Sequence, residues 1–210
     1  MMRNILCFGD SNTFATNPKG GRHPRDVRWT GVLQRLLGED YYVIEEGMGG
    51  RTTVWDDPYE PNRSGKMALP IALQSHKPLD LVIVCLGTND CKEYFHAPAY
   101  MAAKGAEILC NMVREYEYGP GFPVPQILLI SPIHIGEDVM NSPYKCFGYD
   151  APAKSKEFGK YYKETAERLG CLYLDASAAA VPSMTDQLHM DPESHRALAE
   201  AVYEIVRKIW

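Results

Sequence analysis

A serine, a histidine and an aspartate are placed along this chain in a pattern that suits nucleophilic catalysis. Ser11 lies in a Gly-Asp-Ser-Asn segment near the N-terminus, and Asp186 precedes His189 by three residues near the C-terminus. A serine hydroxyl is a weak nucleophile that needs an adjacent base, and a third group must orient that base. We therefore predict that Ser11 is the nucleophile of an acyl transfer, that His189 is its base and that Asp186 orients His189.

Acyl transfer also needs hydrogen-bond donors directed at the oxyanion of the tetrahedral intermediate. Gly50 follows a second apolar run, and the absence of a Cβ lets its backbone approach closely. Asn89 follows a third apolar run and offers two side-chain amide hydrogens. We predict an oxyanion hole made by the N–H groups of Ser11 and Gly50 and by the Asn89 amide. Taken singly, each residue also has a structural explanation, as a helix cap or a turn residue.

Short apolar runs alternate with longer amphipathic segments along the chain. Strands are expected at residues 5–8, 42–44, 81–86, 127–130 and 171–174, because parallel strands that are covered on both faces are apolar at consecutive positions. Helices are expected at residues 29–37, 67–76, 100–116, 153–169 and 192–208, with Pro70 in the first turn of the second. This alternation predicts one α/β domain over residues 1–210, a three-layer α/β/α sandwich with a central five-stranded parallel sheet.

The segments that carry the candidate residues come directly after predicted strands or before the last helix. In open parallel sheets, ligands bind beyond the carboxyl ends of the strands, so these segments are expected to meet at one edge. Two connections, residues 52–65 and 132–152, are longer than a tight α/β unit needs. Long loops in a compact domain are usually functional or interfacial, the alternative being a surface insertion without a role.

The same segments resemble the four motif blocks of the SGNH hydrolases, also called GDSL esterases or lipases. The matching residues are Gly-Asp-Ser at 9–11, Gly50, Gly-Thr-Asn-Asp at 87–90 and Asp-x-x-His at 186–189. In that family, the first block supplies the nucleophile, the second and third complete the oxyanion hole, and the last supplies the base and its aspartate. The resemblance thus implies the same five roles here, a flavodoxin-like SGNH hydrolase fold and a carboxylic-ester hydrolase activity.

Within that family, several segments look like those of the bacterial arylesterase/acyltransferase branch, notably residues 5–11, 26–33 and 43–47. Members of that branch hydrolyse short-chain esters of aryl and alkyl alcohols, some transfer the acyl group to alcohols, and they assemble as homo-oligomers. The resemblance implies the same properties here, with short-chain (acetyl-type) esters as substrates. Phe14 stands where that branch's enzyme has tryptophan, and this difference bears on the shape of the pocket.

Other polar and aromatic residues near the strand ends are weighed for supporting roles. Five of them are predicted to contact the substrate: Asp10, Asn12, Phe14, Trp55 and His134. Asp10 and Asp90 are also expected to accept hydrogen bonds that fix their loops. For Arg51 we expect pairing with a carboxylate, and steering of an anionic substrate is the alternative.

Composition and charge exclude several other classes of function. The formal net charge is −5, which argues against nucleic-acid binding. No apolar stretch approaches the roughly 20 residues of a membrane span, and no leader segment is evident, so we expect a cytoplasmic protein without a membrane partner. The cysteines form no CxxC pair, and no histidine spacing matches a metal motif, so we expect neither a metal nor another cofactor.

Three alternatives to a simple esterase remain at this point. A carbohydrate O-acetylesterase is one, since aromatic residues near the long loops could stack on a sugar: Trp55, Tyr94, Phe95, Tyr144 and Tyr149. A non-catalytic binding module on the same scaffold is the second. The third is an α/β-hydrolase, which is disfavoured because its Gly-x-Ser-x-Gly elbow would need a glycine where Thr13 stands.

Overall fold

Five parallel strands form the middle layer of the protein. The computed structural model describes residues 2–210. The strands are β1 (Arg3–Gly9), β2 (Tyr41–Gly47), β3 (Leu81–Cys85), β4 (Gln126–Ser131) and β5 (Leu172–Asp175). They pair in the order β2-β1-β3-β4-β5, and every neighbouring pair is parallel. The predicted five-stranded parallel sheet is therefore confirmed, and its strand order is that of flavodoxin-like folds.

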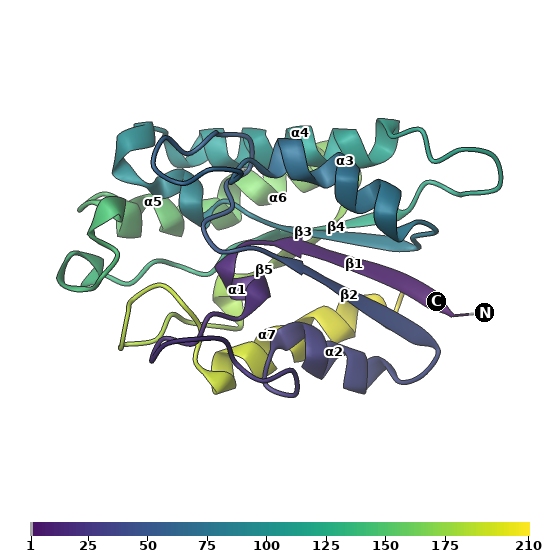
Figure 1. The fold of residues 1–210 in the computed structure, drawn as a ribbon, viewed down its shortest axis with the longest axis horizontal. Coiled ribbons are helices and arrows are strands. Elements are labelled where there is room, and N and C mark those ends of the chain that lie inside the picture. Colours follow the sequence, from purple (N-terminus) through teal and green to yellow (C-terminus); the bar gives the residue numbers. More distant parts are fainter. Residues whose placement is uncertain (1) are drawn as a thin grey trace.

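Helices cover both faces of this sheet. They are α1 (Ser11–Phe14), α2 (Trp29–Leu37), α3 (Gly65–His76), α4 (Ala99–Glu115), α5 (Ala151–Lys156), α6 (Phe158–Leu169) and α7 (Pro192–Val206). Helices α2 and α7 pack side by side under one face, whereas α3, α4 and α6 lie over the other (Figure 1). The three-layer prediction is thus confirmed. Within residues 2–210, none of the helices combines the length and the apolar character needed to cross a membrane.

Each face of the sheet has its own hydrophobic core. Along β1, Leu6 and Phe8 belong to the core under α3, α4 and α6, while Ile5 and Cys7 belong to the core over α2 and α7. All four side chains are fully buried. Alternate residues of a strand point to opposite faces, so a strand between two helical layers must be apolar at every position. This is why the apolar runs mark the strands so clearly.

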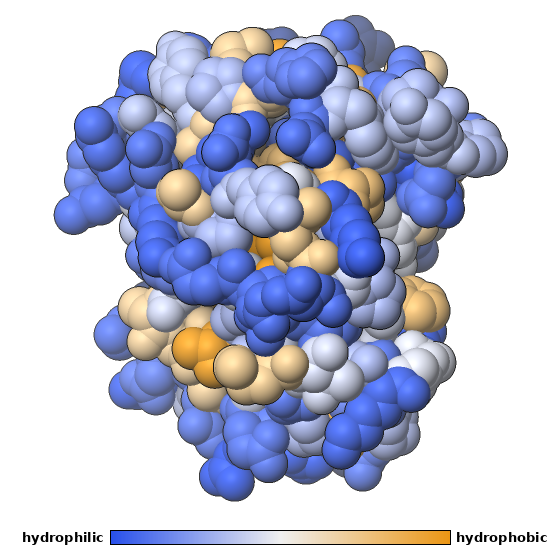
Figure 2. Space-filling view, turned by 90° about the vertical axis from the view of Figure 1, so that its left-hand side faces the viewer, coloured by the Kyte–Doolittle hydropathy of each residue, from blue (hydrophilic) through white to orange (hydrophobic). Residues whose placement is uncertain are grey.

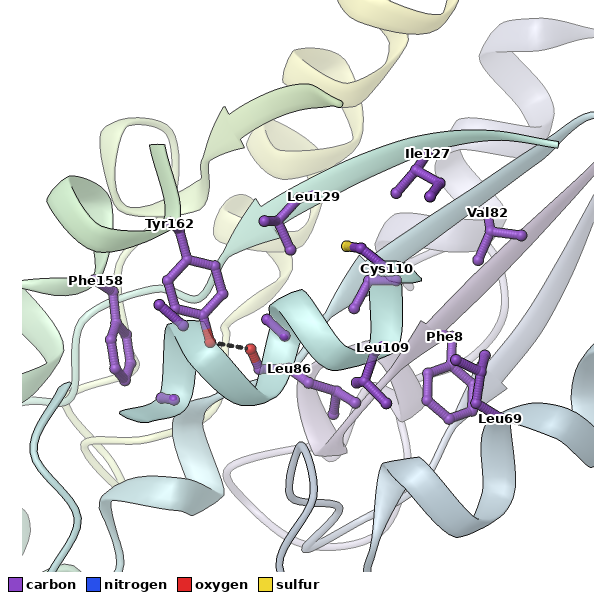
Figure 3. Close-up of a cluster of buried hydrophobic side chains, with 14 of the residues drawn as sticks. Phe8, Leu69, Val82, Leu86, Leu109, Cys110, Ile127, Leu129, Phe158 and Tyr162 are labelled. Atoms are coloured by element: carbon purple, nitrogen blue, oxygen red, sulfur yellow. Dashed lines mark hydrogen bonds between the residues drawn. The ribbon is translucent and has the colours of Figure 1, made fainter. Parts of the chain in front are cut away.

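Tyr162 of α6 links the first of these cores to the end of β3. Its ring is fully buried, and its hydroxyl donates a hydrogen bond of 2.6 Å to the carbonyl oxygen of Leu86 (Figure 3). Leu86 is followed by Gly87 and by a short 3-10 helix, η1 (Thr88–Cys91). The core therefore holds the point at which the chain leaves the sheet and turns toward Asn89.

Two helix predictions were wrong in detail. The segment 153–169 is not one helix, because the N–H of Glu157 bonds to the carbonyl of Lys154 in a tighter turn that separates α5 from α6. Helix α3 begins at Gly65, so Pro70 lies beyond its first turn, and the helix continues through it. The other predicted elements are present, with ends that differ by a few residues.

The end of β2 packs directly on the single-turn helix α1. A Cβ on Gly47 would lie 2.0 Å from the backbone nitrogen of Phe14 and 2.4 Å from the carbonyl carbon of Thr13. Contacts this short with backbone atoms cannot be relieved by turning a side chain. Only glycine therefore permits this approach of α1 to the sheet.

We predict that Gly47→Ala lowers the free energy of unfolding by about 2–3 kcal/mol, the upper part of the usual range for overpacking. Gly49→Ala is the matched control, since a Cβ there has no atom within 4 Å. Urea unfolding followed by circular dichroism measures both variants. Equal unfolding midpoints for the two variants would show that α1 is not held by this contact.

Candidate active site

A cavity of about 270 Å³ opens at the carboxyl end of the sheet, beyond β1 and β3. Four of the predicted catalytic residues line it: Ser11, Gly50, Asn89 and His189. The other lining residues are Thr16, Gly49, Glu60, Arg63, Lys92, Tyr144, Cys146, Phe147 and Leu188. Figure 2 shows this end of the molecule, where hydrophilic side chains surround a small apolar area. The strand order reverses between β1 and β3, so the cavity lies at the topological switch point of the sheet.

Ser11 is the first residue of α1, which starts directly after β1. The Asp10 carboxylate caps this helix by accepting the N–H of Asn12 at 2.9 Å. The backbone carbonyl of Asp10 accepts the N–H groups of Thr13 and Phe14. An N–H at the first position of a helix has no acceptor within that helix, so the Ser11 N–H is available to a ligand. The Ser11 side chain and its backbone donor are thus presented at one point.

Asp186 and His189 form a buried pair on the loop before α7. Asp186 Oδ2 lies 2.7 Å from His189 Nδ1, and Asp186 Oδ1 accepts the N–H groups of Leu188 and His189 at 3.0 and 2.9 Å. Burial acts to raise the pKa of Asp186, but the hydrogen bonds from His189 outweigh it and hold this pKa below its ordinary value. The carboxylate is therefore ionised at neutral pH. Because Nδ1 is engaged, Nε2 is the His189 nitrogen left for proton transfer.

The long loop after β4 covers the histidine. The Tyr144 ring packs edge-on against the His189 ring, with centroids 5.1 Å apart and an interplanar angle of 76°. Cys146 and Phe147 from the same loop also line the cavity. The loop is tied to the histidine loop, since the Gly136 N–H donates to the Gln187 carbonyl at 2.8 Å. This placement agrees with the expectation that the loop at residues 132–152 is functional or interfacial.

Gly50 and Asn89 face the cavity from two further loops. Gly50 has φ 74°, in the left-handed region that favours glycine, and a Cβ there would come within 2.6 Å of a Glu60 carboxylate oxygen. Asn89 Nδ2 donates one hydrogen to the Arg51 carbonyl at 3.1 Å. An amide has two such hydrogens, so the second stays available. Backbone and side-chain donors therefore meet beside Ser11.

Asp90 and Arg51 make hydrogen bonds that fix these loops on the side away from the cavity. Asp90 accepts the N–H of Thr53 at 3.0 Å and also the Thr53 hydroxyl. Burial raises the pKa of Asp90 to about 7, although both of these bonds act in the opposite direction. Arg51 is buried and donates to the carbonyl oxygens of Gly9 and Glu46. The expected pairing of Arg51 with a carboxylate was therefore wrong, since its partners are the main-chain ends of β1 and β2.

The residues that line the cavity do not include the five predicted to contact the substrate: Asp10, Asn12, Phe14, Trp55 and His134. Asp10 is 2% exposed and caps α1, and the Asn12 amide bonds the main chain of the histidine loop. Phe14 lies under the Arg22 guanidinium, 4.1 Å from ring centroid to Cζ. All three side chains thus lie outside the cavity lining, and those of Asp10 and Asn12 bond α1 and the histidine loop.

Trp55 and His134 were placed near the substrate because they follow strands or lie in long loops. The Trp55 ring instead stacks on Phe95, with centroids 5.7 Å apart. His134 lies between the buried residues Ile133 and Ile135 and is half-exposed. Proximity in sequence to a strand end thus did not decide which side chain reaches the cavity.

A network of charged side chains forms one wall of the cavity. Lys92 Nζ lies 2.7 Å from Asp57 Oδ2 and 3.8 Å from Glu60 Oε2, and Arg63 Nε lies 3.1 Å from the same Glu60 oxygen. The Tyr94 hydroxyl donates to Asp57 Oδ2 at 2.6 Å. Burial acts to raise the pKa of Asp57, but the bonds from Lys92 and Tyr94 lower it to about 2. Sequence reasoning missed this wall, although it singled out the loop at residues 52–65.

Comparisons with known proteins agree with this geometry. An arylesterase from M. smegmatis is 36% identical and superposes with a TM-score of 0.91, covering 99% of this chain and 100% of that chain. A carbohydrate acetylesterase from Sinorhizobium meliloti is 36% identical, with a TM-score of 0.93 and coverage of 99% and 100%. No protein with a curated description gives a significant match.

The family model of the GDSL-like lipases and acylhydrolases matches residues 7–197. That range contains the segments of all five predicted catalytic residues and every strand except the start of β1. The α/β-hydrolase alternative is therefore wrong, and so is the reading of the chain as a binding module. The chain is a serine esterase and belongs to the GDSL-like lipase/acylhydrolase family.

Proposed function

We propose that the protein hydrolyses short-chain, acetyl-type carboxylic esters through a Ser11–His189–Asp186 triad. His189 Nε2 takes the proton from Ser11 Oγ as this oxygen attacks the ester carbonyl carbon. The ester C–O bond then breaks, and the alcohol leaves with the proton from His189. The buried Asp186–His189 pair, joined at 2.7 Å beside the cavity that Ser11 lines, is the observation that carries this proposal.

The charge that develops on the carbonyl oxygen needs donors already in place. We assign this role to the N–H groups of Ser11 and Gly50 and to the free Asn89 amide hydrogen. In the second half-reaction, His189 activates water, which attacks the acyl-enzyme and releases the acid. Another alcohol in place of water would give acyl transfer, which we include in the proposal. The cavity of about 270 Å³ has room for an ester with a short acyl group.

A sugar ester is the second candidate substrate, and the charged wall favours it. Glu60, Arg63 and Lys92 present donors and acceptors to the cavity within a network in which two cations oppose two anions. Such paired groups suit neutral hydroxyls, which both donate and accept hydrogen bonds. The likeness to a carbohydrate acetylesterase supports the same reading.

Ser11→Ala is expected to lower kcat for p-nitrophenyl acetate by about three to six orders of magnitude, because the nucleophile is lost. Ser177→Ala is the matched control, since Ser177 bonds Asp175 after β5 and does not line the cavity. Initial rates and circular dichroism spectra are measured for both variants. A Ser11→Ala enzyme with the wild-type rate would refute the triad.

Replacing Arg63 by Met tests the sugar candidate. We expect kcat/KM for acetylated xylo-oligosaccharides to fall by about tenfold or more, as for loss of a hydrogen bond to a charged group, and kcat/KM for phenyl acetate to change less than threefold. Arg207→Met is the control, because Arg207 also pairs with a glutamate three residues away but lies at the end of α7. A kcat/KM for the acetylated xylo-oligosaccharides that changes no more than that for phenyl acetate would contradict the sugar candidate.

A further inference from the structure

The Asn12 side chain joins the nucleophile's helix to the histidine loop. Asn12 follows Ser11 in α1, and it is 6% exposed. Its Nδ2 donates to the Leu188 carbonyl oxygen at 3.2 Å, and its Oδ1 accepts the Met190 N–H at 3.1 Å. Leu188 and Met190 are the two neighbours of His189. One amide therefore makes hydrogen bonds to the main chain on both sides of His189.

The Asp186–His189 pair cannot by itself place the histidine against the nucleophile. Both residues lie on one loop, and among residues 2–210 the partners of the Asp186 carboxylate are N–H groups and a ring nitrogen of that same loop. The pair could therefore move as a unit relative to α1. The distance from Ser11 to His189 must be set by contacts between the two segments.

Other contacts hold the histidine loop to different parts of the protein. His23 Nε2 lies 3.3 Å from the Met190 carbonyl oxygen, and the Gly136 N–H donates to Gln187. Within residues 2–210, Asn12 is the one residue of α1 with a side-chain hydrogen bond to this loop. It is thus the direct polar link between the helix of the nucleophile and the main chain of the base.

We propose that Asn12 is a positioning residue that sets the distance between His189 and Ser11. The proposal rests on the triad function proposed above. Asn12 does not line the cavity, so it acts through His189 and not on the substrate. Loss of the link leaves Asp186 and His189 paired but lets them shift from Ser11. A misplacement of about 1 Å at a reacting centre costs roughly a hundredfold in rate.

Gln34 provides a matched comparison far from the cavity. Its Nε2 donates to the Tyr41 carbonyl at 2.8 Å, and its Oε1 accepts the Val43 N–H at 2.8 Å. This amide also makes hydrogen bonds to the main-chain groups on both sides of one residue, which here lies in β2. Removing it eliminates the same kinds of hydrogen bond without touching either catalytic segment.

The first experiment compares Asn12→Leu with Gln34→Leu, at a temperature where both are folded. We expect kcat of Asn12→Leu for p-nitrophenyl acetate to fall about a hundredfold with KM changed less than threefold. The kcat of Gln34→Leu should stay within about twofold of wild type, whereas both variants unfold at lower urea. Asn12→Asp keeps an oxygen that can accept the Met190 N–H but loses the donor to Leu188, so it should recover part of kcat, and it serves if the leucine variant does not fold. Wild-type kcat in Asn12→Leu, or in Asn12→Asp if the leucine variant does not fold, would overturn the proposal.

A double-mutant cycle with His189→Ala separates positioning from a general structural effect. If Asn12 acts through His189, adding Asn12→Leu to His189→Ala should change the residual rate by less than about twofold. A further hundredfold loss in that background would overturn the proposal. Failure of the triad itself looks different, because Ser11→Ala and His189→Ala would then both retain the wild-type rate.

Discussion

Three strands of the sheet end at the same level, and the arrangement of the site depends on this register. Gly9 pairs with Gly47 of β2 on one side and with Cys85 of β3 on the other. Parallel strands run in the same direction, so the segments that follow them leave the sheet side by side. The turn of Ser11 and the segments that carry Gly50 and Asn89 are thus brought together by main-chain pairing. Short loops are then sufficient to bring the side chains of the site together.

The polar side chains behind the cavity bond mainly to the main chain. Arg51 binds carbonyl oxygens at the ends of β1 and β2, and Asp90 receives the N–H of Thr53. Asp186 and Asn12 likewise bond main-chain groups of the histidine loop. A buried polar group without a partner costs about 1–3 kcal/mol, so each of these contacts favours one loop conformation over others. Rigid positions for the residues that line the cavity follow from a layer of residues that lie behind it.

The sequence allowed us to predict the fold and four of the residues that line the cavity, because both depend on local features of the sequence. Consecutive apolar residues mark β1 and β3, and Ser11 and Asn89 follow those strands within a few positions. The contacts of Asn12 were not predictable, since Leu188 lies 176 residues away. Nor was the approach of Lys92 to the cavity, which depends on the path of an irregular loop. Tyr144 was named only among five aromatic candidates for sugar stacking, and its packing against His189 depends on the path of the long loop after β4. The division of residues 151–169 into two helices depends on a single tighter turn at Glu157, which has no strong sequence signal.

The claim that unites these observations is that Ser11 Oγ forms the covalent acyl-enzyme. Peptide mass spectrometry after reaction with a fluorophosphonate tests it most directly, because the phosphonyl adduct does not turn over. We expect one phosphonyl group per chain, on the peptide that contains Ser11. We expect no phosphonyl group on this peptide when the enzyme is denatured before labelling. A folded wild-type protein that takes no label, or that takes it on another residue, would contradict the claim.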